Sequence, residues 1–111
     1  MGSSNLVEKL HSRIIHDFMD IFILAEMKGD SLSGYDAINL IHREFGVLVS
    51  SGTVYSLLYS LERDGLIRGT WNDRKRVYEL TEKGERNMEA IAKVNEEVQN
   101  FLRRISLINK P

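Results

Sequence analysis

The chain has 111 residues, of which 42% are hydrophobic and 28% are charged, and its net charge is −1. This length and composition predict one globular domain and exclude a largely disordered chain. Cysteine is absent, which excludes disulfides and thiolate metal sites. Because nucleic-acid binders usually carry an excess of Lys and Arg, any such activity here must depend on a local basic patch.

No apolar run reaches the length that a membrane-spanning helix needs. Asp20 and Glu26 interrupt the longest one, FMDIFILAEM. The first residues, MGSSNLVEKL, do not combine a basic region with an apolar stretch, as a secretion signal does. We therefore expect a cytoplasmic protein.

Apolar residues spaced by three or four predict a long amphipathic helix over residues 6–27. Gly29 ends this helix before the polar turn GDSLS. The stripe consists of Leu6, Leu10, Ile14, Phe18, Phe22 and Ala25.

A second helix is predicted to begin after Ser33, its N-cap, and to end near Phe45, where Gly46 supplies a left-handed stop. Its apolar stripe begins at either Tyr35 or Ala37. The rest of this stripe is Ile38, Ile41 and Phe45.

A third helix is predicted over residues 53–64, capped by Ser50 or Ser51 and closed by Gly65. Four of its side chains form an apolar arc about 100° wide, which is typical of a core-facing stripe. These four are Val54, Leu57, Leu58 and Leu61.

The opposite face of the third helix is suited to a DNA groove, because hydroxyls and Arg contact phosphates and base edges. Ser51 and Thr53 lie at the helix N-terminus, where free N–H groups favour phosphate. Tyr55 lies at the flank, so packing on the hairpin or second helix stays open beside DNA contact. This face consists of Gly52, Tyr55, Ser56, Tyr59, Ser60 and Arg63.

Alternating residues after Gly65 predict two antiparallel strands, 66–71 and 76–80, joined by the loop NDRK. Thr81 caps a final helix over residues 82–107. This order predicts a mainly α fold with a small β-hairpin: a winged helix-turn-helix over residues 1–81 and a dimerisation helix over 82–111. A three-helix interaction module with an incidental hairpin is the alternative.

Arg74, Lys75 and Arg76 place three positive charges at the hairpin tip and the start of the return strand. Beside a groove-sized helix they are expected to neutralise DNA phosphates, although a run of this kind also fits a solvated turn. Trp71 is expected to pack the hairpin onto the first or last helix, with a place in an effector pocket as the alternative.

Six apolar residues of the final helix follow a heptad pattern, which predicts a dimer seam or, alternatively, a core helix. We expect residues 6–22 of the first helix to pack against this seam. A two-fold dimer would place two recognition helices on the half-sites of a pseudo-palindromic operator. The seam consists of Ile91, Val94, Val98, Phe101, Ile105 and Ile108.

Nothing in the sequence indicates an enzyme, since it contains no convergent Ser/His/Asp set and no glycine-rich phosphate loop. His11 and His16 are five residues apart and do not share a helix face. Glu8, Asp17 and Asp20 are better explained as a solvated helix face. We expect no metal and no cofactor.

Three segments in order, LSGYDAI, SSGTVYSLLYSLERDGLI and RKRVYELTEKGE, resemble the PadR family of winged-helix transcriptional regulators. The resemblance covers residues 24–85 and implies a dimeric repressor, whose third helix and wing bind operator DNA and whose C-terminal helix dimerises. It also implies a response to phenolic acids or lipophilic drugs near the dimer interface. The last helix lacks the tryptophan of some drug-binding relatives, for which Phe101 is a partial substitute. The competing hypothesis is a winged-helix adaptor whose tyrosine face binds a protein.

Overall fold

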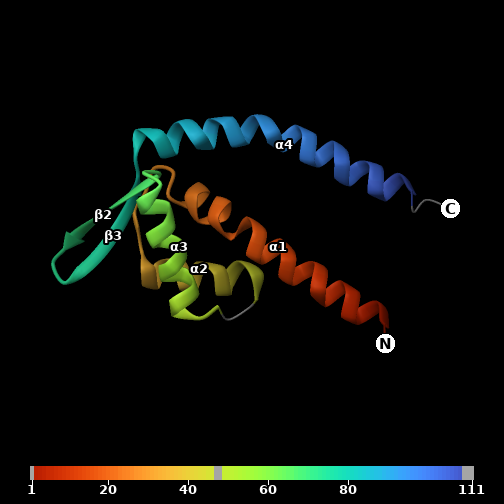
Figure 1. The fold of residues 1–111 in the computed structure, drawn as a ribbon, viewed down its shortest axis with the longest axis horizontal. Coiled ribbons are helices and arrows are strands. Elements are labelled where there is room, and N and C mark those ends of the chain that lie inside the picture. Colours follow the sequence, from red (N-terminus) through yellow and green to blue (C-terminus); the bar gives the residue numbers. More distant parts are fainter. Residues whose placement is uncertain (1, 47–48, 109–111) are drawn as a thin grey trace.

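The computed structural model describes residues 2–46 and 49–108, with side chains described for residues 5–46 and 49–105. Figure 1 shows α2, α3 and the hairpin together at one end of the molecule, with α1 and α4 extending away to the same side. The molecule is elongated, with extents of 58 × 33 × 20 Å. The winged helix-turn-helix arrangement is confirmed. Its elements are α1 (Gly2–Glu26), β1 (Leu32–Ser33), α2 (Gly34–Phe45), α3 (Ser51–Arg63), β2 (Ile67–Asn72), β3 (Lys75–Leu80) and α4 (Glu82–Ile108).

The sheet has three antiparallel strands in the order β1-β3-β2, one more than the predicted hairpin. The short strand β1 pairs with β3 through Leu32 and Tyr78. Asn72 pairs with Lys75, so the loop of the hairpin is two residues shorter than predicted. Asp73, the first loop residue, has a φ of 57°, in the left-handed region that Asn and Asp tolerate better than most residues.

The hydrophobic core lies where α1, α2 and α3 meet the sheet. Ile23, Ile41, Val54 and Leu58 are fully buried within it. The core-facing residues of α1 are Ile15, Met19, Ile23 and Leu24, and Met27 follows directly after the helix, so the predicted stripe lies on another face of α1. In the predicted stripe Leu6, Leu10, Ile14 and Phe18 are 45–68% exposed, Phe22 is partly buried and Ala25 is exposed. The first part of α1 also extends beyond the winged-helix body, which α2, α3 and the sheet form (Figure 1).

Capping geometry confirms the predicted start and end of α2. Ser33 and Asp36 form a capping box at the start of α2, and Gly46 ends that helix with a φ of 67°. Ser50 caps α3, which begins two residues earlier than predicted. Residues 47 and 48 of the predicted connection lie outside the described residues.

Thr81 joins the start of α4 to the end of α3. Its hydroxyl donates to the Gly65 carbonyl at 2.6 Å and accepts from the Gly84 N–H at 3.1 Å. The N-capping role predicted for Thr81 is therefore confirmed, and the same hydroxyl fixes the direction in which α4 leaves the sheet. Gly84 lies against Leu66, whose carbonyl oxygen would be 2.1 Å from an added Cβ.

Trp71 lies where the sequence did not place it, and Tyr35 settles which of two residues begins the stripe of α2. Trp71 packs on neither α1 nor α4; it is 68% exposed on the hairpin, with the Arg76 guanidinium 5.7 Å from its ring centroid. Tyr35 is 66% exposed, so the buried stripe of α2 begins at Ala37. Both aromatic rings therefore remain available to a ligand.

Candidate nucleic-acid interface

The two faces of α3 divide as the helical wheel predicts. Val54, Leu58 and Leu61 are buried and Leu57 is partly buried, so this side anchors the helix in the core. On the other side Tyr59 is 67% exposed. Ser56, Arg63 and the backbone of Gly52 are exposed with it, and an added Cβ at Gly52 would meet no atom within 4 Å.

The N-terminus of α3 is closed by a local hydrogen-bond pair. The Ser50 hydroxyl accepts from the Thr53 N–H at 3.2 Å, and the two hydroxyl oxygens of these residues lie 2.8 Å apart. Ser51 and Gly52 are exposed beside this cap. Their first-turn N–H groups have no intrahelical partner, which favours a phosphate there.

Tyr55 packs on the start of α2, the alternative left open by the sequence. A Cβ added to Gly34 would lie 2.3 Å from the Tyr55 Cε1 atom, so the ring occupies the space that this glycine leaves. Nearly half of the side chain, 48%, is nevertheless exposed. Tyr55 therefore fixes α3 against α2 and presents one edge outward, whereas Tyr59 projects freely from the helix.

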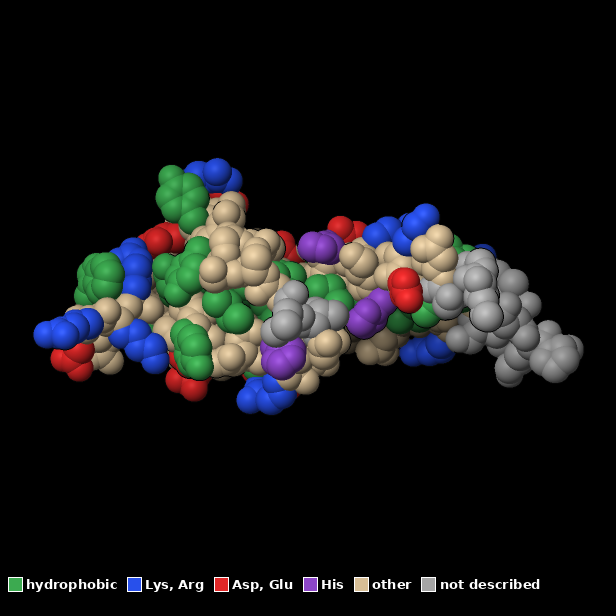
Figure 2. Space-filling model, turned by 90° about the horizontal axis from the view of Figure 1, so that it is seen from below, with side chains coloured by type: hydrophobic (Ala, Val, Ile, Leu, Met, Phe, Trp, Pro, Cys, Tyr) green, Lys and Arg blue, Asp and Glu red, His purple; other side chains and the backbone are tan. Residues whose placement is uncertain are grey.

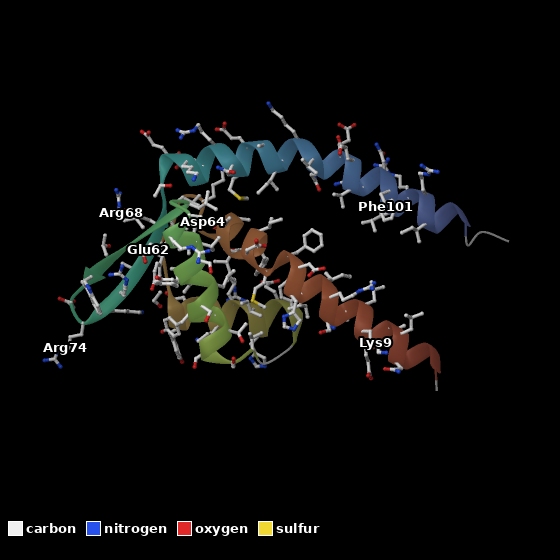
Figure 3. The ribbon with its side chains drawn as sticks, viewed as in Figure 1. Lys9, Glu62, Asp64, Arg68, Arg74 and Phe101 are labelled. Atoms are coloured by element: carbon white, nitrogen blue, oxygen red, sulfur yellow. The ribbon has the colours of Figure 1, made fainter. Side chains whose placement is uncertain are left out.

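Glu62 connects α3 to the hairpin through two hydrogen bonds to the same carboxylate oxygen. Its Oε2 accepts from the Gly69 N–H at 3.0 Å and from the Arg76 guanidinium at 2.9 Å. An added Cβ at Gly69 would lie 2.6 Å from the Arg76 Nε atom, so glycine leaves the room that this guanidinium occupies. Figure 3 shows Glu62 on the side of α3 that faces the hairpin.

Arg76 therefore differs from its two basic neighbours. It is paired with Glu62 and lies 5.7 Å from the ring centroids of both Trp71 and Tyr78, a distance typical of cation–π contacts. Its predicted contact with a DNA phosphate stays a prediction, and in the structure its guanidinium links α3 to the hairpin.

Arg74 and Lys75 form the exposed basic tip of the hairpin. Figure 3 shows Arg74 projecting from the end farthest from α4. Among the described side chains, no carboxylate forms an ion pair with either residue. Figure 2 shows Lys and Arg side chains at this end of the molecule, together with hydrophobic side chains and some Asp or Glu side chains.

The predicted dimer seam on α4 is largely exposed. Val94, Val98, Phe101 and Ile105 are 41–63% exposed and Ile91 is partly buried, while the Ile108 side chain lies outside the described residues. Figure 3 shows Phe101 on the side of α4 that faces α1. Of the two candidate effector residues, Trp71 belongs to β2 and Phe101 to the C-terminal half of α4. Figures 1 and 3 show β2 and Phe101 at opposite ends of the molecule, so the two residues do not form a joint site.

A further electrostatic feature is the cap at the start of α2. The Ser33 N–H donates to the Asp36 carboxylate and holds the pKa of Asp36 below its ordinary value of 3.8. Within the described part of the chain, no group of three His, Asp or Glu side chains is arranged to hold a metal ion. None of the described helices is long and apolar enough to cross a membrane.

Comparison with known proteins identifies the same architecture. The sequence profile of the transcriptional regulator PadR-like family matches residues 23–90, whereas no curated protein sequence matches the chain. A PadR family transcriptional regulator from Eggerthella lenta has 16% identity and a TM-score of 0.81, over 100% of this chain and 99% of that one. A PadR-like regulator from Bacillus cereus has 20% identity and a TM-score of 0.77, over 89% and 99%.

A third structure is that of Bacillus subtilis PadR in complex with operator DNA. It has 26% identity and a TM-score of 0.53, over 63% of this chain and 44% of that one. The shared part thus corresponds in length to the winged-helix body and not to the whole of that protein.

Proposed function

Because the chain belongs to the PadR-like family of transcriptional regulators, we propose that it binds operator DNA as a homodimer and represses transcription there. The observation that carries this proposal is the exposed polar face of α3 beside the basic tip of the hairpin. Tyr59, Ser56 and Arg63 enter the major groove, and Arg74 and Lys75 contact the phosphate backbone. The chain's likeness to a regulator solved with operator DNA supports this assignment.

Few charges contribute to the electrostatic attraction between this chain and DNA. The net charge is −1, so attraction to DNA depends on where Arg74 and Lys75 lie and on having two copies in one complex. Arg63 lies 3.5 Å from Asp64 in an exposed pair, which is too weak to prevent Arg63 from exchanging its partner for a phosphate.

Dimerisation is proposed to cover the exposed apolar residues of α1 and α4. Contiguous apolar patches of this kind are rare on monomers and mark interaction surfaces. A second copy covers them economically, because Leu10, Ile14 and Phe18 of one protomer and Val98 and Phe101 of the other offer complementary stripes. A lipophilic effector would enter this apolar region near Phe101.

DNA binding is tested by fluorescence anisotropy with operator fragments selected from genomic DNA by the purified protein. The Arg74→Ala/Lys75→Ala variant should bind more weakly. The slope of its log affinity against log salt concentration should be smaller in magnitude by about one for each charge removed. Its matched control is Arg86→Ala/Lys93→Ala, which removes two exposed charges from α4. We expect the control to retain the wild-type salt dependence.

The competing function, a protein-binding adaptor, makes the opposite prediction. An adaptor shows no salt-dependent DNA binding, specific or not, at low ionic strength. Equal behaviour of the hairpin variant and its control would contradict the hairpin contact while leaving the α3 contact in place.

A further inference from the structure

A hollow of about 420 Å³ opens between the start of α2, the Tyr55 ring and the hairpin. It lies between the exposed face of α3 and the basic tip, and it shares Tyr55 with the former and Arg74 and Lys75 with the latter. Its walls combine flat rings with positive charge. The side chains that matter below are Tyr35, Tyr55, Trp71, Arg74, Lys75 and Arg76.

We propose that this hollow holds one sugar–phosphate strand of the bound DNA, and that Tyr35 is a further contact to that strand. The inference rests on the proposed function, because it assumes that α3 and the hairpin engage the same duplex. A duplex whose major groove receives α3 and whose backbone meets the hairpin tip has one strand between these elements. The hollow lies in that space.

The charge of the hollow suits a phosphodiester. Within the described part of the chain, none of the residues that line it is acidic. Arg76 is already paired with Glu62, so Arg74 and Lys75 supply the charge for a ligand. Asp36 lies close enough for Lys75 to lower its pKa, but its carboxylate accepts the Ser33 N–H in the capping box and does not line the hollow.

The rings of the hollow suit a sugar–phosphate strand as well. Tyr35 and Trp71 are each about two-thirds exposed, and neither ring contributes to the hydrophobic core. A tyrosine hydroxyl donates to phosphate oxygens, and an indole face packs against a sugar or a base. Arg76, held by Glu62 near the Trp71 ring, fixes one wall of the hollow in place.

Tyr35 is the residue that tests the inference, because its exposed side chain can be changed without disturbing the core. Tyr35→Phe removes only the hydroxyl and should weaken binding about ten-fold, the effect of one hydrogen bond to a charged group. The loss should be the same on operator and unrelated DNA, since a backbone contact carries no sequence information. Tyr59→Ala, by contrast, should reduce the ratio of operator to unrelated affinity.

Trp71 gives an independent optical readout, because it is the single tryptophan of the chain. Operator DNA should change its emission in the wild-type protein. Adenosine monophosphate at millimolar concentration should not, because an isolated nucleotide lacks the contacts of a continuous strand. A change in Trp71 emission that saturates at micromolar concentrations of this nucleotide would overturn the inference and indicate a nucleotide pocket instead.

The remaining outcomes separate this inference from the proposed function. If the wild-type protein binds no DNA, the proposed function itself fails. If it binds DNA while Tyr35→Phe and Tyr35→Ala bind equally well and Trp71 emission does not change, only the hollow is excluded as the strand site. If the Tyr35 variants lose affinity for operator DNA only, Tyr35 contacts a base and not the backbone, which would contradict the inference.

Discussion

The Glu62 carboxylate and the Arg76 guanidinium form a 2.9 Å ion pair that joins α3 to the hairpin. Both side chains are about one-third exposed, so the pair is less screened than a surface salt bridge. The same Glu62 oxygen accepts the Gly69 N–H, which ties the carboxylate to the hairpin backbone. The pair therefore sets the angle between the helix and the hairpin.

Removing the Glu62 charge should loosen this angle. We expect Glu62→Gln to lower the free energy of unfolding by about 1–2 kcal/mol, because a charge-assisted bond to a partly buried Arg76 is weakened. Glu79→Gln is the matched control, since its pair with Arg68 is more exposed and should cost well under about 1 kcal/mol. Urea denaturation measures both.

The same two variants also separate hairpin orientation from net charge in DNA binding. Each removes one negative charge, so any general gain in attraction to DNA is equal. Glu62→Gln should bind operator DNA more weakly than Glu79→Gln. Equal affinities would show that the hairpin keeps its position without Glu62.

The capping box at the start of α2 makes the free energy of unfolding depend on pH in the acidic range. The pKa of Asp36 is lower in the folded chain than its ordinary value of 3.8, so its contribution is present at neutral pH and is lost as pH falls through the folded pKa. Asp36→Asn should therefore be less stable than wild type at pH 7, and the difference should shrink toward pH 3. A difference that stays constant from pH 7 to pH 3 would contradict this assignment.

Gly84 should be the least replaceable glycine in the described chain. The Cβ of Gly84→Ala would lie 2.1 Å from the Leu66 carbonyl oxygen, a backbone atom that cannot move aside cheaply. We expect a loss of about 1–3 kcal/mol or more. Gly52→Ala is the control, because its Cβ enters open space; a similar loss there would contradict the steric explanation.

Dimerisation should depend on the exposed face of α4. Val98→Glu/Phe101→Glu introduces charges into the proposed seam and should give a monomer in sedimentation at micromolar concentration, where the wild type is a dimer. Lys93→Glu, at an exposed position that is not part of the seam, should remain dimeric. A wild-type protein that is monomeric at this concentration would refute the seam.

The features that the sequence predicted correctly are those set by local chemistry. Ser33 and Gly46 bound α2 because a hydroxyl cap and a left-handed stop act within one turn of the helix. The buried side of α3 followed from the spacing of Val54, Leu58 and Leu61 alone. Each of these inferences used residues close together in the chain.

The features that it missed depend on residues far apart in the chain. Leu32 pairs with Tyr78, and a two-residue strand has no periodicity of its own. The Glu62–Arg76 pair spans 14 positions, so nothing local distinguishes Arg76 from the two basic residues before it. The first helix carries two apolar stripes, and periodicity alone does not tell which of them faces the core.

The exposure of Trp71 was missed for a related reason. Alternation along a strand indicates which residues share a face, but not whether another element covers that face. In the folded chain no described helix covers Trp71. The same absence of cover forms the hollow that we assign to the DNA strand.

The central claim is tested most directly by measuring operator affinity against salt concentration for the wild type, Tyr59→Ala and Arg74→Ala/Lys75→Ala. We predict binding that weakens steeply with salt, a lower operator preference for Tyr59→Ala, and a shallower salt dependence for the hairpin variant. A wild-type protein that binds neither operator nor unrelated DNA at low salt would contradict the account.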